Sequence, residues 1–579
     1  MSDSWIPNDP SSAIYRLWSR ANAGEVFPDP ITPLNASIGF LHNIEPGWRL
    51  ALVETGMFDE GSWDDTIPHN PIAVFHGYIY LNMSLSRLFG VRLGVGAQAI
   101  DDAYFGDMPG IPSYESEARP TDEDAAATER GQAWMSGAAA TQDLARYDAD
   151  RVTVLGIVAN RPDLTASTER ELLEQLTVHE ELAVHLWQAH LAASTIVGIG
   201  IGACGQIAAA IGRPELALAL SSGFGDIDSA QATHEMWPLS RLVAKSAHLR
   251  EVIAGNVGRR WDAIVGDDHP DAVEFVAAVG QFLDRWGFRG PNEWELRSDT
   301  WGTKPEILMT AIETMSRADD AESPAVRSDR QIAEHVEAVA AVREALAADE
   351  ATSAMFEGQL NIAEMFSRAR ERARMTVALL LHEQRLAANE LGRRLVANGV
   401  IDHANLIYML GIDELTQVID GQHDVLAELP AREARYLELF DYVPPFVVAG
   451  DVPPLEDWDR HSQAKAGEPL AIGESLTGLG GAPGSISGSV RIVRSPADPT
   501  ALEPGEILVC PITDPAWTPL FLAAGGVVCE VGAPVSHAAI VSRELGIPCA
   551  VSVGGALSRL ADGMVIEIDG GSGTVTRTA

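Results

Sequence analysis

Hydrophobic residues recur with a helical period over most of the chain. Ala, Leu, Glu and Gln stand at spacings of three and four, which places apolar side chains on one face of an α-helix. This spacing predicts helices over 122–147, 165–211, 230–256, 328–353 and 357–398. Residues 1–120 are instead rich in Pro, Gly, Asn and aromatic residues, in short mixed segments. We therefore expect a predominantly α-helical chain up to about residue 450.

The pattern changes after that point. The stretch "PPFVVAGDVPPLEDWDRHSQAKAGEP" carries prolines and charges without periodicity, which is typical of a linker. Beyond it, glycines separate short β-rich runs, namely "GSVRIVRS", "GEILVCPI", "GVVCEV", "IPCAVSV", "GMVIEID" and "GTVTRT". Helix-like segments at 516–524 and 537–545 are set among them. The sequence predicts a multidomain α+β protein: a large, mainly helical domain (1–450), a linker (451–475) and a small α/β domain (476–579).

The composition is that of a globular protein with a strongly acidic surface. The formal net charge is −41, and nucleic-acid backbones and anionic membranes reward basic patches, so we expect neither as a partner. Four cysteines without a CxxC or Cys/His spacing fit a reducing compartment and structural burial. The polar N-terminus lacks the apolar core of an export signal. These features predict a cytoplasmic protein.

Three patterns look functional but have simpler explanations. Residues 191–211 are uncharged and nearly long enough to span a bilayer, yet their glycines and Gln206 favour a buried helix. Within them "GIGACG" matches GxGxxG, but a dinucleotide site needs a preceding strand, and the preceding pattern is helical. The histidines of "HEELAVH" stand six residues apart and miss the HExxH spacing. We therefore predict neither a nucleotide fingerprint nor a metal site.

One histidine has surroundings that supply a mechanism. "GAPVSHAAIVSRELGIP" places His537 at the start of a predicted helix that ends at Gly546. Neutral imidazole is a nucleophile near pH 7, and the N–H groups at a helix start favour an anion and disfavour imidazolium. The residues expected to support a phosphoryl group there are the N-cap Ser536 and the next two residues of the helix, Ala538 and Ala539. A lone histidine is more often an ordinary core or surface residue. Whether His537 has a function therefore depends on the longer sequence pattern around it.

That longer pattern resembles a known family. The segment from "GSISGSVRIV" through "SHAAIVSRELGIPCAVSV" is similar to the mobile phosphohistidine domain of the phosphoenolpyruvate (PEP)-utilising enzymes. These include pyruvate phosphate dikinase, PEP synthase, rifampicin phosphotransferase and phenylphosphate synthase. The carrier histidine of that family falls on His537, which implies a swivelling β/β/α domain with a phosphohistidine intermediate. One departure is "GAPVSH", where many members have two glycines; it spares the histidine and should stiffen the turn.

The helical part resembles the acceptor-binding domain of rifampicin phosphotransferase. The matching stretches are "GEVFPDPITPLNASIGF", "GYIYLNMSL", "FLDRWGFRGPNEWEL" and "RARERARM". In that family an RExxK pattern on a helix assists phosphoryl transfer, and here it falls on Arg370 and Arg374, with arginine in place of the lysine. At positions i and i+4 the two arginines share one helix face, and their guanidinium groups suit a transferring phosphoryl group. The alternative is that they form a solvated basic face of the helix without a role in transfer. Arg289, Glu293 and Glu295 either orient a substrate or form a buried ion pair.

These resemblances imply one part of a split phosphotransferase. The relatives carry an ATP-grasp domain or a PEP-binding barrel, neither of which fits beside the resembling segments, and the sequence has no GxxxxGK[ST] loop. We expect a separate ATP-grasp subunit to bind ATP and Mg²⁺ and to phosphorylate His537, as in the split phenylphosphate synthase and cresol phosphate synthase systems. The expected acceptor is a small apolar alcohol or phenol, in the degradation of aromatic compounds. A phosphocarrier or regulatory protein without an acceptor, and a binding protein that has lost its chemistry, stay open.

Overall fold

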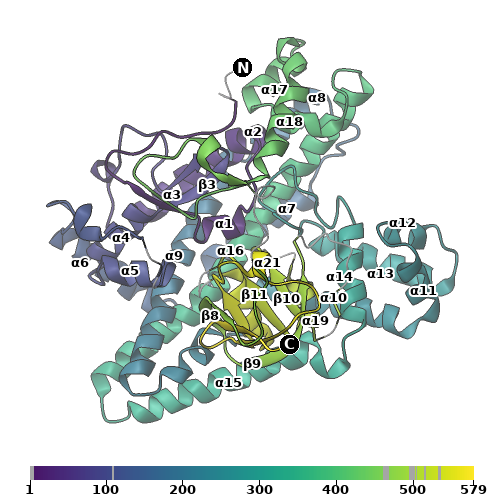
Figure 1. Cartoon of the computed structure of the whole chain (residues 1–579). Coiled ribbons are helices and arrows are strands. Elements are labelled where there is room, and N and C mark those ends of the chain that lie inside the picture. Colours follow the sequence, from purple (N-terminus) through teal and green to yellow (C-terminus); the bar gives the residue numbers. More distant parts are fainter. Residues whose placement is uncertain are drawn as a thin grey trace. The chain divides into compact units, whose positions relative to one another are not determined.

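The computed structural model describes residues 5–106, 108, 110–460, 468–494, 502–503, 505–513, 517–532 and 536–579. Figure 1 traces the chain from its purple N-terminus to its yellow C-terminus. Its residues form two units that do not follow chain order. The first unit comprises Met1–Ile196, Trp294–Ser298 and Arg372–Ala464, and the second comprises Val197–Glu293, Asp299–Glu371 and Lys465–Ala579. The domain boundaries expected at 450 and 475 stay a prediction.

The first unit contains a small antiparallel sheet in the order β2-β3-β1-β5. The strands are β1 (Leu17–Ser19), β2 (Ile72–Phe75), β3 (Tyr78–Asn82) and β5 (Val447–Ala449). Because β5 comes from far along the chain, the sheet joins the N-terminal region to the segment before the predicted linker. A two-stranded sheet pairs β4 (Tyr442–Val443) with β6 (Asp459–Arg460). The helices of this unit are α1 (Ala23–Val26), α2 (Pro33–Asn35), the π-helix Ala36–Ile44, α3 (Glu45–Glu54), α4 (Met83–Leu93), α5 (Ala97–Tyr104), α6 (Ala125–Ala139), α7 (Ala145–Ala159), α8 (Glu169–Thr177), α17 (Ile412–Ile419) and α18 (Leu429–Leu439).

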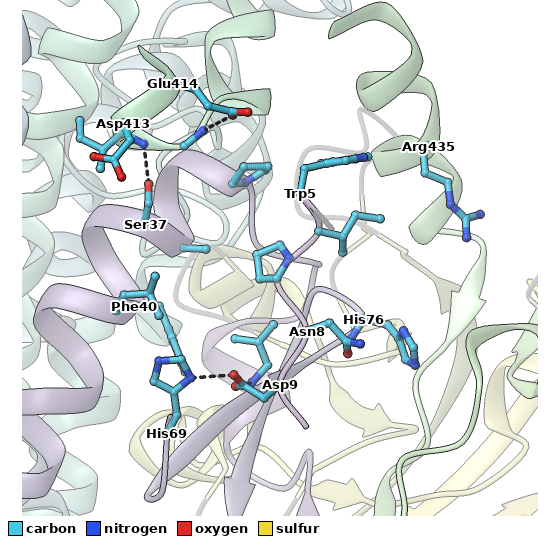
Figure 2. Close-up of a pocket in the computed structure, with 18 of the residues that line it drawn as sticks. Trp5, Asn8, Asp9, Ser37, Phe40, His69, His76, Asp413, Glu414 and Arg435 are labelled. Carbon is cyan, nitrogen blue, oxygen red and sulfur yellow. Dashed lines mark hydrogen bonds and ion pairs between the residues drawn. The ribbon is translucent and has the colours of Figure 1, made fainter. Parts of the chain in front are cut away.

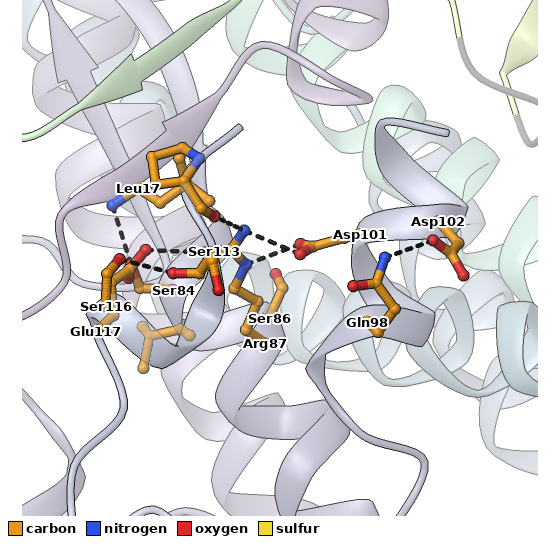
Figure 3. A network of polar contacts seen from close by, with 12 residues as sticks. Leu17, Ser84, Ser86, Arg87, Gln98, Asp101, Asp102, Ser113, Ser116 and Glu117 are labelled. Atoms are coloured by element: carbon orange, nitrogen blue, oxygen red, sulfur yellow. Dashed lines mark hydrogen bonds and ion pairs between the residues drawn. The ribbon is translucent and has the colours of Figure 1, made fainter. Parts of the chain in front are cut away.

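A buried ion network fixes helix α4 in this unit (Figure 3). The guanidinium of Arg87 is fully buried and donates to both carboxylate oxygens of Asp101, at 2.8 and 2.9 Å, and to Glu117 at 2.8 Å. Glu117 also accepts from the hydroxyl of Ser84, which in turn accepts the N–H of Leu17. A buried cation is tolerated only when its charge and donors are satisfied. The network therefore anchors α4 to α5, to the loop at Glu117 and to strand β1.

The second unit is helical apart from its C-terminal segment. Its helices are α10 (Asp228–Lys245), α11 (Ala247–Gly255), α12 (Arg260–Val265), α13 (Pro270–Trp286), α14 (Glu306–Ser316) and α15 (Pro324–Ala345). The long helices α9 (Glu180–Ala210) and α16 (Glu350–Ala397) contribute residues to both units.

Caps divide some of the predicted helices. Ser246 accepts the N–H of Leu249 and starts α11, while Asp349 accepts the N–H of Thr352 at the start of α16. A side-chain acceptor at such a point replaces the missing helical partner and starts a new helix. Local capping therefore set boundaries that periodicity alone had merged.

The C-terminal segment (residues 475–579) forms an eight-stranded sheet in the order β7-β14-β13-β9-β10-β11-β12-β8 among the described residues. The strands are β7 (Ser475–Thr477), β8 (Leu479–Ala482), β9 (Ser485–Ile492), β10 (Ile507–Cys510), β11 (Gly526–Cys529), β12 (Cys549–Val551), β13 (Val565–Asp569) and β14 (Thr574–Arg577). Strands β9 to β12 are parallel, and the outer strands pair antiparallel. Each of the six predicted β-runs contains a strand. Glycine-rich β7–β8 was not predicted because "LTGLGGA" lacks the β-branched pattern.

This sheet encloses an apolar core. Val490, Ile507, Val509, Val528 and Ile566 are fully buried in it. The helices beside the sheet are α19 (Thr518–Ala523), α20 (His537–Leu545) and α21 (Ala556–Arg559). All four cysteines of the chain are buried, as predicted, and three of them stand on β10, β11 and β12. The predicted fold class, a large helical part followed by a small β-rich domain, is confirmed.

The uncharged stretch at 191–211 belongs to a helix that packs in a protein core. By length and composition alone, the described segment Glu169–Ala210 could cross a membrane. However, Cys204 and Ala208 of α9 are fully buried against Val342 of α15 and Phe356 of α16. The "GIGACG" glycines lie inside this helix rather than between a strand and a helix, and 44% of the apolar window is buried.

Candidate functional site

His537 is the first residue of α20, as the sequence predicted. The hydroxyl of Ser536 accepts the N–H of Ala539 at 3.2 Å, which is the predicted N-cap. The helix ends at Gly546, whose φ of 65° is the left-handed conformation that glycine adopts without a steric penalty. The imidazole is half-buried, whereas Ser536 and Ala538 are buried. A phosphoryl group on His537 would meet the helix N-terminus, but Ser536 already occupies the Ala539 N–H.

Thr513 is a site residue that the sequence analysis missed. Its Oγ1 lies 3.1 Å from Nδ1 of His537, and its side chain is buried. Phe521 of α19 packs edge-on against the imidazole, with ring centroids 6.0 Å apart. Thr513 follows β10 and His537 follows β11, two parallel neighbours. Carboxyl ends of parallel strands meet at one edge, where ligands commonly bind. A polar residue directly after the buried run "GEILVCPI" was the signal that could have revealed it.

The structure places Arg370 and Arg374 one turn apart on α16, on either side of the division between the two units. The guanidinium of Arg370 contacts the carboxylate of the neighbouring Glu371, at 2.8 Å from Nη2 and 3.2 Å from Nε. The guanidinium of Arg374 lies 5.9 Å from the ring centroid of Trp294. Both side chains therefore have partners that fix their direction. Their role in transfer stays a prediction.

Trp294 is the centre of an aromatic cluster in the first unit that the sequence analysis also missed. Its indole meets Trp187 at 4.6 Å, His190 at 5.4 Å and Phe27 at 5.6 Å between ring centroids. With Arg374 over the ring, the cluster joins a cation to several aromatic faces. These residues come from three distant parts of the sequence, so no local motif could have identified them.

Arg289 and Glu293 form a buried ion pair, one of the two alternatives that the sequence left open. Nε of Arg289 lies 2.8 Å from Oε2 of Glu293, and both side chains are about 3% exposed. The guanidinium also lies 6.0 Å from the ring centroid of Trp301. Within the second unit this pair therefore has a clear structural role, and a role in substrate orientation stays a prediction.

Glu295 has different contacts from its neighbours. Its carboxylate accepts from the backbone and hydroxyl of Thr32, from the amide of Asn35 and from the N–H of Arg297. Complete burial raises the pKa of this carboxyl, and these hydrogen bonds oppose the rise. The contacts tie the N-terminus of α2 to the 294–298 segment. Glu295 therefore holds the first unit together, and a substrate role for it also stays a prediction.

Two segments of the chain match family models. Residues 190–371 match the model of the rifampicin phosphotransferase fourth domain, and residues 502–573 match the PEP-utilising enzyme mobile domain. The second match contains both Thr513 and His537. The predicted resemblance is confirmed. The first match contains Arg289 and Arg370, whereas Arg374 lies just beyond its end.

Curated relatives extend this similarity over nearly the whole chain. An uncharacterised protein of Mycobacterium tuberculosis is 27% identical over 596 residues, which cover 98% of this chain and 62% of the relative. A rifampicin phosphotransferase of Streptomyces sviceus is 27% identical over 53% of this chain and 35% of its own length. The prodigiosin-synthesising transferase PigC of Serratia marcescens is 25% identical over 62% of this chain and 39% of its own length. The chain thus spans less than two thirds of each of these relatives.

Proposed function

We propose that this chain is a phosphotransferase component that carries a phosphoryl group on His537 and transfers it to the hydroxyl of a small acceptor. The observation that supports this most is the contact between Thr513 and His537 at the N-terminus of α20. It lies inside the segment that matches the PEP-utilising mobile domain. The relatives named as phosphotransferases point in the same direction.

The contact with Thr513 assigns a role to each imidazole nitrogen. When Nδ1–H donates to Oγ1 of Thr513, the lone pair of the neutral ring lies on Nε2. Nε2 would attack the phosphorus atom of the donor, so a P–N bond forms as the donor P–O bond breaks. The N-terminus of α20 favours the negative charge that results.

The second half-reaction returns the phosphoryl group to oxygen. The acceptor oxygen attacks phosphorus, the P–N bond breaks, and the acceptor proton passes to solvent. Arg370 and Arg374 would stabilise the charge on the equatorial oxygens during this step. Glu371 and Trp294, which contact these guanidiniums, would hold them in position.

The phosphoryl donor in this proposal is ATP, bound with Mg²⁺ by an ATP-grasp partner. In the family that the sequence resembles, such a module charges the carrier histidine and releases AMP and phosphate. A group of three or more His, Cys, Asp or Glu side chains suited to a metal was not found among the described residues. A cytoplasmic location, where ATP is available, is part of the proposal.

The acceptor is proposed to be a small apolar alcohol or phenol. The resemblance of the sequence to the split phenylphosphate synthase system supports this, because phenols are the acceptors there. A role in the degradation of aromatic compounds, as in phenylphosphate synthase, belongs to the same proposal.

The test separates the two half-reactions. The chain is incubated with an ATP-grasp partner, Mg²⁺ and ATP labelled in the β-phosphate, and then with a panel of phenols and alcohols. We expect acid-labile, base-stable label on the chain, which then passes to one class of acceptor, with AMP as nucleotide product. Label that forms but passes to no acceptor would favour a phosphocarrier or regulatory protein. If no label forms with any partner, the proposal is wrong.

A further inference from the structure

The first unit contains a large cavity to which the proposed phosphoryl transfer assigns no role (Figure 2). Its volume is about 1020 Å³, which is enough for a drug-sized ligand. Four segments far apart in the sequence line it, around residues 5–9, 33–42, 411–414 and 454–456, together with single residues such as His69. None of its lining residues belongs to the unit that contains His537.

The inner wall of the cavity is apolar and aromatic. Phe40, Ile6, Val74 and Leu455 line it and are buried. Phe40 lies on the π-helix Ala36–Ile44, a rare form that often occurs at functional sites. The accessible apolar surface of the lining lies on the half-buried Trp5 and on Leu41, which is 43% exposed. An apolar ring would replace water against these two side chains, which is favourable in proportion to the apolar area covered.

An aspartate–histidine pair stands beside this wall. Nδ1 of His69 lies 2.8 Å from Oδ1 of Asp9, and Oδ2 of Asp9 accepts the N–H of Val74 at 2.8 Å. Phe40 packs edge-on against the imidazole, with centroids 5.1 Å apart. Asp9 is thus fixed by the backbone and orients His69 with Nδ1–H toward the carboxylate. In the neutral ring with its proton on Nδ1, Nε2 is the hydrogen-bond acceptor, which suits a ligand hydroxyl or ammonium group.

The outer part of the cavity is acidic. Asp413 and Glu456 line it with exposed side chains, and no ion-pair partner of either is found in the part of the chain that the structure describes. The carboxylate of Glu414 differs, because Arg432 neutralises it at 2.8 and 2.9 Å. Two exposed carboxylates of the lining are therefore without an ion-pair partner among the described residues.

The basic groups of the lining do not offset this charge. Arg435 is engaged by Glu438, and His42 is 3.4 Å from Glu180. Burial lowers the pKa of His76, whose Nε2 lies 3.1 Å from the carbonyl of Pro453, so His76 is neutral at pH 7. The cavity therefore offers hydrogen-bond acceptors and negative charge to a ligand.

We propose that this cavity binds a small organic amine with an apolar ring. The ring packs against Trp5 and Leu41, the ammonium group faces Asp413 and Glu456, and a hydroxyl or N–H of the ligand donates to Nε2 of His69. Nucleotides and other anions are disfavoured, because the same carboxylates repel them. The site is independent of His537 and does not rest on the proposed phosphoryl transfer.

The experiment compares two phenolic probes of opposite charge. Binding of tyramine and of 4-hydroxyphenylacetate to the full chain is measured by titration calorimetry at fixed ionic strength. We expect the amine to bind at least about tenfold more tightly than the acid, which corresponds to about 1.4 kcal/mol. The variant Asp413→Asn/Glu456→Gln should lose this preference. The matched variant Asp402→Asn/Glu181→Gln removes two exposed carboxylates outside the cavity and should keep it.

Two further variants locate the ligand and separate this site from the carrier histidine. His69→Gln should weaken tyramine about tenfold, since the hydrogen bond from the ligand hydroxyl to the imidazole is lost. The thermal unfolding of this variant is also measured, so that a loss of folding can be told from a loss of binding. His537→Ala should bind tyramine as the wild type does. Equal affinity for both probes, no binding of tyramine up to millimolar concentration, or retention of the preference in the cavity double variant would each overturn the proposal.

Discussion

The histidine site of the C-terminal segment and the cavity of the first unit differ in how far apart their residues lie in the sequence. Thr513 and His537 are 24 residues apart and follow neighbouring parallel strands. The cavity instead joins residues from Trp5 to Glu456. A site made within one supersecondary unit leaves a contiguous motif in the sequence. A site made by distant segments leaves no motif, although its chemistry is equally specific.

The interiors of these regions differ in the same way. The C-terminal sheet is held by apolar side chains such as Val509 and Val528, which neighbouring strands place together. In the first unit the charged network of Arg87 joins α4, α5 and β1. Apolar burial is non-directional, whereas a buried ion network specifies one arrangement and is costly when incomplete. The C-terminal core should therefore tolerate more substitution than the Arg87 network.

The largest expected effect is at the histidine. His537→Ala should abolish formation of the phosphorylated chain and all transfer, because the proposed function makes this residue the covalent intermediate. Circular dichroism and thermal unfolding should match the wild type, since the half-buried imidazole adds little to the core. Phosphate label is measured with an ATP-grasp partner present. Stable incorporation into the variant would show that another residue is the carrier.

The next effect should be on folding of the first unit. Arg87→Ala leaves the carboxylates of Asp101 and Glu117 without their buried cation, and we expect the free energy of unfolding to fall by about 3–5 kcal/mol. Denaturant titration measures it. Arg259→Ala is the control, since its ion pair with Asp262 is 4.0 Å long and exposed, and it should cost below about 1 kcal/mol. Similar losses in both variants would contradict the assigned importance of the network.

A smaller effect is expected on transfer alone. Arg370→Ala or Arg374→Ala should slow the second half-reaction by about 10²–10³-fold, the scale of losing one charge-stabilising donor. Phosphorylation of His537 should be unchanged, which single-turnover labelling can show. Arg372→Ala is the matched control on the same helix, because its guanidinium pairs with Asp148. Equal damage to both half-reactions would mean that Arg370 and Arg374 are structural.

The smallest effect is expected from substitution of Thr513, which contacts the imidazole of His537. Thr513→Val keeps the side-chain shape but removes the hydrogen bond to Nδ1, and we expect phosphorylation of His537 to slow about tenfold. Thr513→Ser should restore most of the rate. Nitrogen NMR of the imidazole should show a mixed tautomer in the valine variant and one favoured tautomer in the wild type. An unchanged rate and tautomer would remove Thr513 from the mechanism.

Local features of the structure were predictable because their causes are local. The N-cap at Ser536, the helix at His537 and the glycine at its end lie within a few residues of one another, and each has a known conformational preference. Six strands of the C-terminal sheet followed from short β-branched runs between glycines. Thr513 was missed because its importance depends on the pairing of β10 with β11.

The sequence by itself determined the helix that begins at His537, the helical and β-rich parts, and the burial of the cysteines, since hydrophobic period and capping chemistry act over a few residues. Only the tertiary structure decided what Arg289, Glu293 and Glu295 contact, and that Trp294 lies beneath Arg374. It also decided which carboxylates and rings share a cavity. These contacts join side chains from distant segments, and their geometry is fixed by packing of the whole unit rather than by any local preference.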